Sequence, residues 1–192
     1  MIGETINAPY AEKFTVSNVF SSDMVVQRGE HIRVWGFADA SENGRKVSGE
    51  FMGMFAEALI ENGAWTLTFG ARLNACAEQG NSMRIYTDRT AFVFENVLVG
   101  DVFMVIGQSN VAYSMAAHRT AVPEAERGGV GYDVPSTPIR LHYNSLMQET
   151  GVTRGTEEVC AELRNRETWK RADAAAVQDF SALGYLFAAE YA

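Results

Sequence analysis

The chain has 192 residues, of which 47% are hydrophobic and 21% charged, a balance typical of a globular protein rather than a disordered one. Its 16 basic and 24 acidic residues give a formal net charge of -8, and no basic stripe appears, which argues against nucleic acid as a partner. No apolar run is long enough for a membrane span and no signal peptide is visible, which favours a cytoplasmic location unless a signal was removed.

The first half of the chain predicts a β-sandwich. Short apolar stretches alternate with turn residues as far as Glu95, at a spacing typical of antiparallel sheets. Two hairpins are expected, one over 58–69 with its turn at Asn62-Gly63 and one over 83–94. The sequence therefore predicts an all-β domain over residues 1–95.

Aromatic residues on these strands have two interpretations. Trp35, Trp65, Phe51 and Phe69 would suit a sugar-binding platform, but at alternating strand positions such residues more often form the core. Core is the preferred interpretation. His31, on the expected strand 31–37, is interpreted as an ordinary surface or edge histidine.

The second half opens with a different pattern. Val102–Ile106 is an uninterrupted apolar run, which predicts a strand buried on both faces. Gly107 breaks the run, and apolar residues then recur at helical spacing from Asn110 to His118. Ser109 would thus lie at the carboxyl end of a strand, where a helix begins and its N–H groups can stabilise an oxyanion.

From the local pattern alone, Ser109 is either a helix N-cap or a nucleophile. The Gly-x-Ser-x-Gly elbow of hydrolases is not met, because Val111 occupies the second glycine position. Gln108 and Asn110 flank the serine and would either hydrogen-bond the substrate or its oxyanion, or fix the turn.

After Glu95 the alternating pattern of the strands gives way to a continuous apolar run, which predicts a second domain over residues 96–192. Its further elements are a long loop over 119–136, a strand over 139–143, a surface insertion over 147–168 and a helix capped by Asp179.

No histidine is expected to activate Ser109. His118 would lie about 13 Å further along a continuous helix, and His142 is interpreted as structural or pocket-lining. The histidines, Cys76 and Cys160 lack metal-ligand spacing, so neither a metal nor a cofactor is expected. The two cysteines are expected to be reduced, although one bridge between them stays open.

Several stretches resemble the SGNH hydrolases, and among them the sialate O-acetylesterases and related carbohydrate acetylesterases. Asp101-Val-Phe with Gly107-Gln-Ser-Asn110 is similar to their pattern Gly-Asp-Val-Trp-x-x-x-Gly-Gln-Ser-Asn-Met. The other matching stretches, in the same order along the chain, are Val16–Arg28 with Val34-Trp-Gly36, Pro138–Leu141, and Trp169 with Phe180–Phe187.

The resemblance implies a β-sandwich followed by the first part of an SGNH-type, flavodoxin-like α/β/α domain, hence a mixture of all-β and α/β folds. It implies that Ser109 is the nucleophile of an O-acetylesterase acting on sugars, with its own N–H as one oxyanion donor. The family's Asp-x-x-His lies further along the chain than residue 192, so a truncated enzyme is expected. The alternatives are a catalytically silent carbohydrate-binding fragment and a second chain that completes the hydrolase domain.

Overall fold

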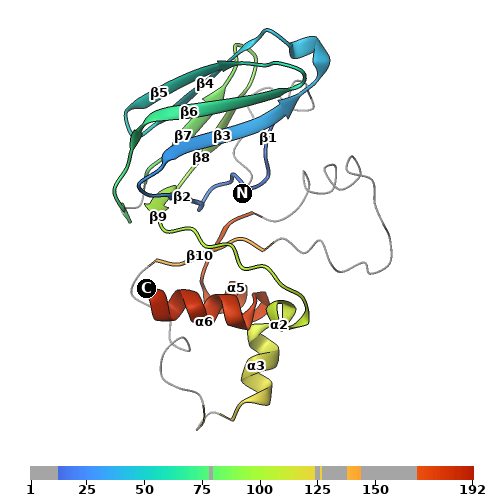
Figure 1. Ribbon diagram of the computed structural model, residues 1–192, viewed down its shortest axis with the longest axis vertical. Helices are drawn as coiled ribbons and strands as arrows, with labels where there is room; N and C mark the ends of the chain where they lie inside the picture. Colours follow the sequence, from blue (N-terminus) through green and yellow to red (C-terminus); the bar gives the residue numbers. More distant parts are fainter. Residues whose placement is uncertain (1–12, 78–79, 124–125, 127–137, 144–167) are drawn as a thin grey trace. The chain divides into compact units, whose positions relative to one another are not determined.

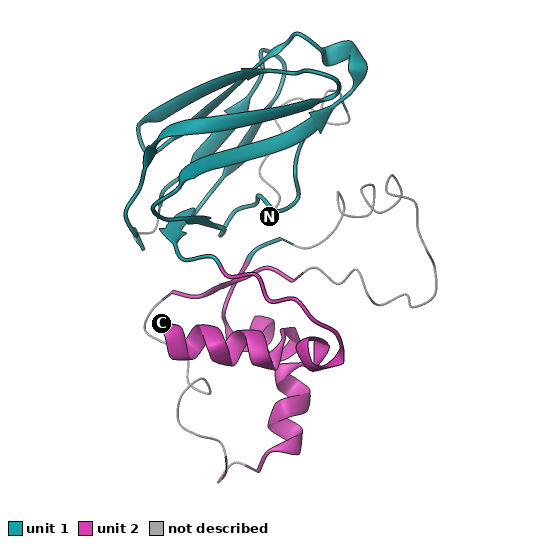
Figure 2. Cartoon of the chain, viewed as in Figure 1, with its two compact units in different colours: residues 1–102, 144–169 teal, residues 103–143, 170–192 magenta. Residues whose placement is uncertain are grey.

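A computed structural model describes residues 13–77, 80–123, 126, 138–143 and 168–192. Its contacts divide the chain into two compact units (Figures 1 and 2). Unit 1 comprises residues 1–102 and 144–169, and unit 2 comprises residues 103–143 and 170–192. The predicted surface insertion and most of the predicted loop after Arg119 lie outside the described residues.

Unit 1 is built from short strands, and its described residues form two antiparallel sheets. One has the order β1-β3-β6 and the other β5-β4-β7-β8, while β2 and β9 form a parallel pair. The strands are β1 (Phe14–Val16), β2 (Val25–Gln27), β3 (His31–Ala38), β4 (Lys46–Phe51), β5 (Met54–Leu59), β6 (Ala64–Arg72), β7 (Met83–Tyr86), β8 (Ala91–Phe94) and β9 (Leu98–Gly100). A short 3-10 helix, Ala40–Glu42, follows β3.

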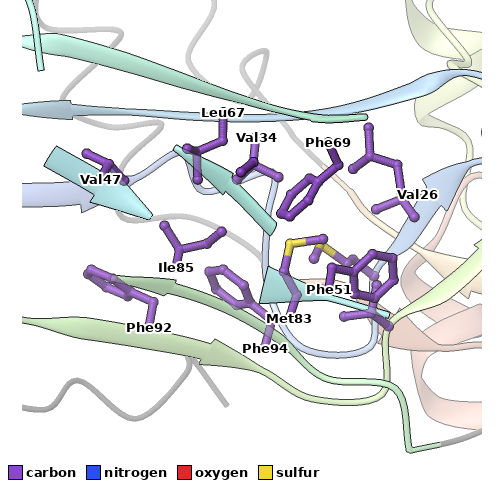
Figure 3. Close-up of a cluster of buried hydrophobic side chains, with 14 of the residues drawn as sticks. Val26, Val34, Val47, Phe51, Leu67, Phe69, Met83, Ile85, Phe92 and Phe94 are labelled. Atoms are coloured by element: carbon purple, nitrogen blue, oxygen red, sulfur yellow. The ribbon is translucent and has the colours of Figure 1, made fainter. Parts of the chain in front are cut away.

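The inward faces of the two antiparallel sheets form one hydrophobic core (Figure 3). Val34 of β3 and Leu67 of β6 point toward Ile85 and Phe92 of the other sheet. Alternation along β6 buries Trp65, Leu67 and Phe69 together, as the period-two pattern predicts. This burial is the main contribution to the stability of unit 1, because it removes the largest apolar side chains from water.

The two predicted hairpins have different outcomes. The one over 83–94 is confirmed, since β7 and β8 pair in antiparallel register. The Asn62-Gly63 turn also forms, with φ of 53° and 74°, and Glu61 and Ala64 exchange backbone hydrogen bonds across it. However, β5 pairs with β4 and β6 pairs with β3, so this turn carries the chain from one sheet to the other.

The predicted strand over Val102–Ile106 is absent. All five side chains are exposed, from 36% for Val105 to 83% for Met104, and the segment belongs to no sheet. An apolar run becomes a strand only when neighbouring strands exchange backbone hydrogen bonds with it. No described segment does so here.

The described residues of unit 2 form four short helices and one two-stranded sheet. They are α2 (Ser109–Ala112), α3 (Met115–Ala121), α5 (Ala174–Asp179), α6 (Ala182–Tyr191), β10 (Arg140–Leu141) and β11 (Lys170–Arg171), with β10 and β11 antiparallel. Its core is formed by Met115, Leu141, Ala172, Val177, Ala182 and Tyr185.

Two helix predictions in unit 2 are wrong. The helix expected from Asn110 to His118 is broken at Tyr113-Ser114, where Ser114 adopts an extended conformation and caps α3. Asp179 does not cap the last helix: it is the final residue of α5, and Ser181 caps α6. Backbone bonds from Met115 to Phe180 and from Ala182 to Tyr113 join the two helix starts, and these bonds favour the break.

The units divide between Val102 and Phe103, later than the predicted boundary at 95/96. The reason is β9, which follows Glu95 but pairs with β2 of unit 1. The fold is therefore a mixed α/β arrangement that is mostly antiparallel sheet, with few helices.

Candidate active site

Ser109 is the first residue of α2 and is exposed to solvent. The N-cap position falls on Gln108, whose side chain makes no capping bond. The N-cap interpretation of Ser109 is therefore wrong. Its hydroxyl makes no hydrogen bond to another described residue. The hydroxyl therefore has no structural contact that would have to break before it could react.

Backbone groups shape the turn around Ser109. The carbonyl of Gln108 accepts from the N–H groups of Val111 and Ala112, at 3.0 and 2.9 Å. The N–H groups of Ser109 and Asn110 have no partner among the described residues, as is usual at a helix start. The side chains of Gln108 and Asn110 are exposed and form no bond in the described structure, so the main chain, rather than either side chain, holds the turn.

The segment leading toward Ser109 is anchored within unit 1 by the opening motif of the chain. Arg28 forms an ion pair with Asp101 at 2.8 Å, and the Oε1 atom of Gln27 accepts from the N–H of Val102 at 2.8 Å. Just before these contacts, β2 and β9 pair in parallel register. Two stretches that the resemblance singled out separately are thus neighbours in space.

Trp169 is a third member of this arrangement. Its indole N–H donates to the carbonyl of Val19 at 2.7 Å, and its backbone N–H donates to Oγ of Ser21 at 2.9 Å. Ser21 is buried and lies in the same opening motif. The sequence did not predict these contacts; its only signal was that Trp169, Val19 and Ser21 all lie in stretches for which a resemblance was noted.

The histidines do not supply a base to Ser109 in the described structure. His31 belongs to unit 1, where its Nδ1 lies 3.2 Å from the carbonyl of Phe69. His118 lies in α3 with its ring 6.3 Å from that of Tyr113, and His142 follows β10. None forms a hydrogen bond with Ser109. The estimate of about 13 Å to His118 assumed one continuous helix, and the break at Tyr113-Ser114 removes that assumption.

No group of three or more His, Cys, Asp or Glu residues that could hold a metal ion occurs in the described ranges. Cys76 is a free, half-buried thiol, and Cys160 lies outside the described residues. None of the described helices is long and apolar enough to cross a membrane.

An open hollow of about 420 Å³ lies in unit 1. It is lined by Arg45, Lys46, Ser48, Tyr86, Thr87 and Asp88. The guanidinium of Arg45 forms ion pairs with Glu42 and Asp88, so its charge is already neutralised by carboxylates of this chain. None of the residues predicted to act with Ser109 contributes to this hollow.

Comparison with known proteins finds similarity in structure but none in sequence families. No family model matches the chain, and no curated protein matches its sequence. The structure is similar to the crystal structure of XAC1771, a carbohydrate acetylesterase from Xanthomonas citri, with a TM-score of 0.64 and 23% sequence identity. The similarity covers 92% of this chain and 37% of that enzyme, so the chain shares the fold of about a third of it.

Proposed function

We propose that this chain carries the nucleophile of a serine esterase that removes O-acetyl groups from sugars, with Ser109 as that nucleophile. The observation that carries the proposal is the Gly107–Asn110 turn, which presents an exposed serine at a helix start within a fold similar to part of a carbohydrate acetylesterase. The chain spans 37% of that enzyme, so activity and substrate are proposals for the whole protein.

The chemistry would proceed in two steps. The Ser109 oxygen attacks the acetyl carbonyl carbon as a base takes its proton, and the ester C–O bond then breaks to release the sugar hydroxyl. Water attacks the resulting acetyl-serine and releases acetate. The backbone N–H groups of Ser109 and Asn110 are available to the oxyanion, since no described residue bonds them. The reaction needs no metal or redox cofactor.

The base would come from a group that does not contact Ser109 in the described structure. A segment beyond the present chain would supply it, as the resemblance implies, or else a second chain would. The exposed Val102–Ile106 segment fits this proposal, because strands that paired with it would bury it and complete a sheet beside the serine turn.

Substitution of Ser109 in the full-length protein tests the proposal. Ser109→Ala is expected to lower acetate release from acetylated xylo-oligosaccharides by about a thousandfold or more, because the covalent route is lost. Ser41→Ala is the matched control, since Ser41 is also exposed but lies in the 3-10 helix of unit 1, outside the serine turn. Full activity in Ser109→Ala would disprove the proposal.

A catalytically silent carbohydrate-binding role is the second candidate. The observation in its favour is that no described histidine contacts Ser109, whereas aromatic residues remain exposed on unit 1. Trp65 cannot belong to a sugar-binding platform, which was one of its two interpretations from the sequence, because it is 3% exposed and stacks on Phe14 in the core. Binding of glycans without Ser109-dependent turnover would favour this candidate.

A further inference from the structure

The hollow of unit 1 lies on the outer face of the β5-β4-β7-β8 sheet, where β4 begins and β7 ends. Alternation along β4 buries Val47 and Phe51 in the core and turns Lys46 and Ser48 to the other side of the sheet. The antiparallel register places Tyr86 of β7 beside Ser48. The volume of about 420 Å³ is within the range of small-molecule sites, about 300–1,000 Å³.

Tyr86 is the aromatic side chain of this hollow, and two contacts fix its ring. Its hydroxyl donates to Oε1 of Glu50 at 2.8 Å, and the guanidinium carbon of Arg84 lies 4.5 Å from the ring centroid. An aromatic ring that is already held in place loses little conformational freedom when a ligand packs against it. Tyr86 therefore gives the hollow a preformed, partly apolar wall.

Both cations that line the hollow are already paired with carboxylates. Arg45 lies 2.6 Å from Glu42 and 2.6 Å from Asp88, and Lys46 lies 3.0 Å from Glu57. An anionic ligand would have to displace one of these carboxylates, and a cationic ligand would have to displace Arg45 or Lys46. Neither sign of ligand charge is favoured, so the hollow suits an uncharged ligand.

The hydrogen-bonding capacity that these pairs leave over is of both kinds. The Nη2 atom of Arg45 has no acceptor among the described residues, and Oδ1 and Oδ2 of the exposed Asp88 each accept only one bond there, from Nη1. Oγ1 of Thr87 accepts from the N–H groups of Arg89 and Thr90, both at 3.2 Å, while its own proton has no acceptor in the described structure. Donors and acceptors side by side match a ligand hydroxyl, which both donates and accepts.

We propose that this hollow is a binding site for a neutral saccharide. The C–H face of a pyranose packs on Tyr86, and its hydroxyls donate to Asp88 and accept from Arg45 and Thr87. Acidic glycans are the main competing ligand, and the existing ion pairs of Arg45 and Lys46 disfavour them. The proposal goes beyond ester hydrolysis, because the hollow belongs to unit 1 and needs no contribution from Ser109.

Amide NMR titration of the full chain with xylohexaose and with mannohexaose, two neutral oligosaccharides without acetyl groups, tests the proposal. At least one of them should shift the signals of the residues that line the hollow. Tyr86→Ala is expected to raise Kd by about tenfold and Asp88→Asn by about fivefold, while Tyr86→Phe keeps most of the affinity. Trp35→Ala is the matched control, because Trp35 is an exposed aromatic residue of the other antiparallel sheet.

Ser109→Ala should bind like the unaltered chain, so failure of the esterase proposal leaves this result unaffected. Four outcomes would overturn the proposal: binding of neither oligosaccharide, shifts that avoid the hollow, an equal rise of Kd in Trp35→Ala, or equal or tighter binding of oligogalacturonate. The side chain of Asp88 is 64% exposed, so Asp88→Asn is expected to fold and decides the result even if Tyr86→Ala lowers the thermal midpoint.

Discussion

Gly107 occupies a position at which a side chain has no room. An added Cβ would lie 2.5 Å from Cγ2 of Val111 and 3.2 Å from its Cβ. Valine is branched at Cβ and stiff about χ1, so it cannot move aside as a long flexible side chain would. The need for glycine here is steric, and it determines how closely the chain turns into α2 beside Ser109.

Gly107→Ala is expected to displace this turn and to lower kcat/KM for Ser109-dependent ester hydrolysis by the full-length protein by about tenfold or more. Adding Val111→Ala removes the obstructing methyl groups and should restore most of the loss. Gly70→Ala serves as the control, because no atom lies within 4 Å of a Cβ added there. The steric argument is wrong if the single variant is fully active or if the double variant is no better than the single one.

At the scale of the secondary-structure elements, side-chain caps decide where the helices of unit 2 begin. Ser114 accepts from the N–H of Ala117 at 3.2 Å, and Asp173 accepts from those of Ala175 and Ala176 at 3.0 and 2.8 Å. Ser181 accepts from the N–H of Gly184 at 3.2 Å. Each cap satisfies donors that the first helical turn leaves without a partner.

Ser181→Ala should therefore lower the free energy of unfolding by about 1 kcal/mol or more, since Ser181 is buried and its loss leaves the N–H of Gly184 unsatisfied. Asp179→Ala tests the capping role expected from sequence, and it should change stability by less than about 0.5 kcal/mol. Urea denaturation followed by circular dichroism measures both. A larger loss in Asp179→Ala than in Ser181→Ala would contradict the observed helix start.

At the scale of the whole molecule, the two units have separate cores, and Tyr185 is the largest side chain in the core of unit 2. It is 1% exposed, and burial raises the pKa of its phenol, an effect that the charge of Arg119 partly offsets. In unit 1, the Tyr86 hydroxyl donates to Glu50 at 2.8 Å, which raises the pKa of Tyr86 as well. Both folded units therefore hold a tyrosine proton more tightly than the unfolded chain does.

These pKa shifts predict a loss of stability at alkaline pH. A raised pKa in the folded state contributes stability that is complete below about pH 10, the value for an unfolded tyrosine, and is lost as the pH rises through the folded-state pKa. The thermal midpoint of the chain should fall more steeply above about pH 10 than that of Tyr185→Phe, which has no phenol to ionise. Parallel curves for the two proteins would show that Tyr185 is not responsible.

The sequence by itself determined the local features of this protein: the alternation that buries Trp65, Leu67 and Phe69, the Asn62-Gly63 turn and the β7-β8 hairpin. These depend on side-chain periodicity and on φ preferences, which are properties of neighbouring residues. It also singled out Ser109 as the candidate nucleophile, through resemblance in the surrounding turn. Its assignment as a nucleophile stays a prediction.

Only the tertiary structure decided the pairing of distant segments. The Asn62-Gly63 turn joins strands of different sheets, Gln27 and Arg28 bond the segment that leads toward Ser109, and Trp169 bonds Val19 and Ser21. Val102–Ile106 has the composition of a buried strand but is exposed. A strand is buried in a sheet only when neighbouring strands pair with it, and its own composition does not specify whether those strands are present. Backbone pairing is a property of two segments, so one segment's pattern leaves it undetermined.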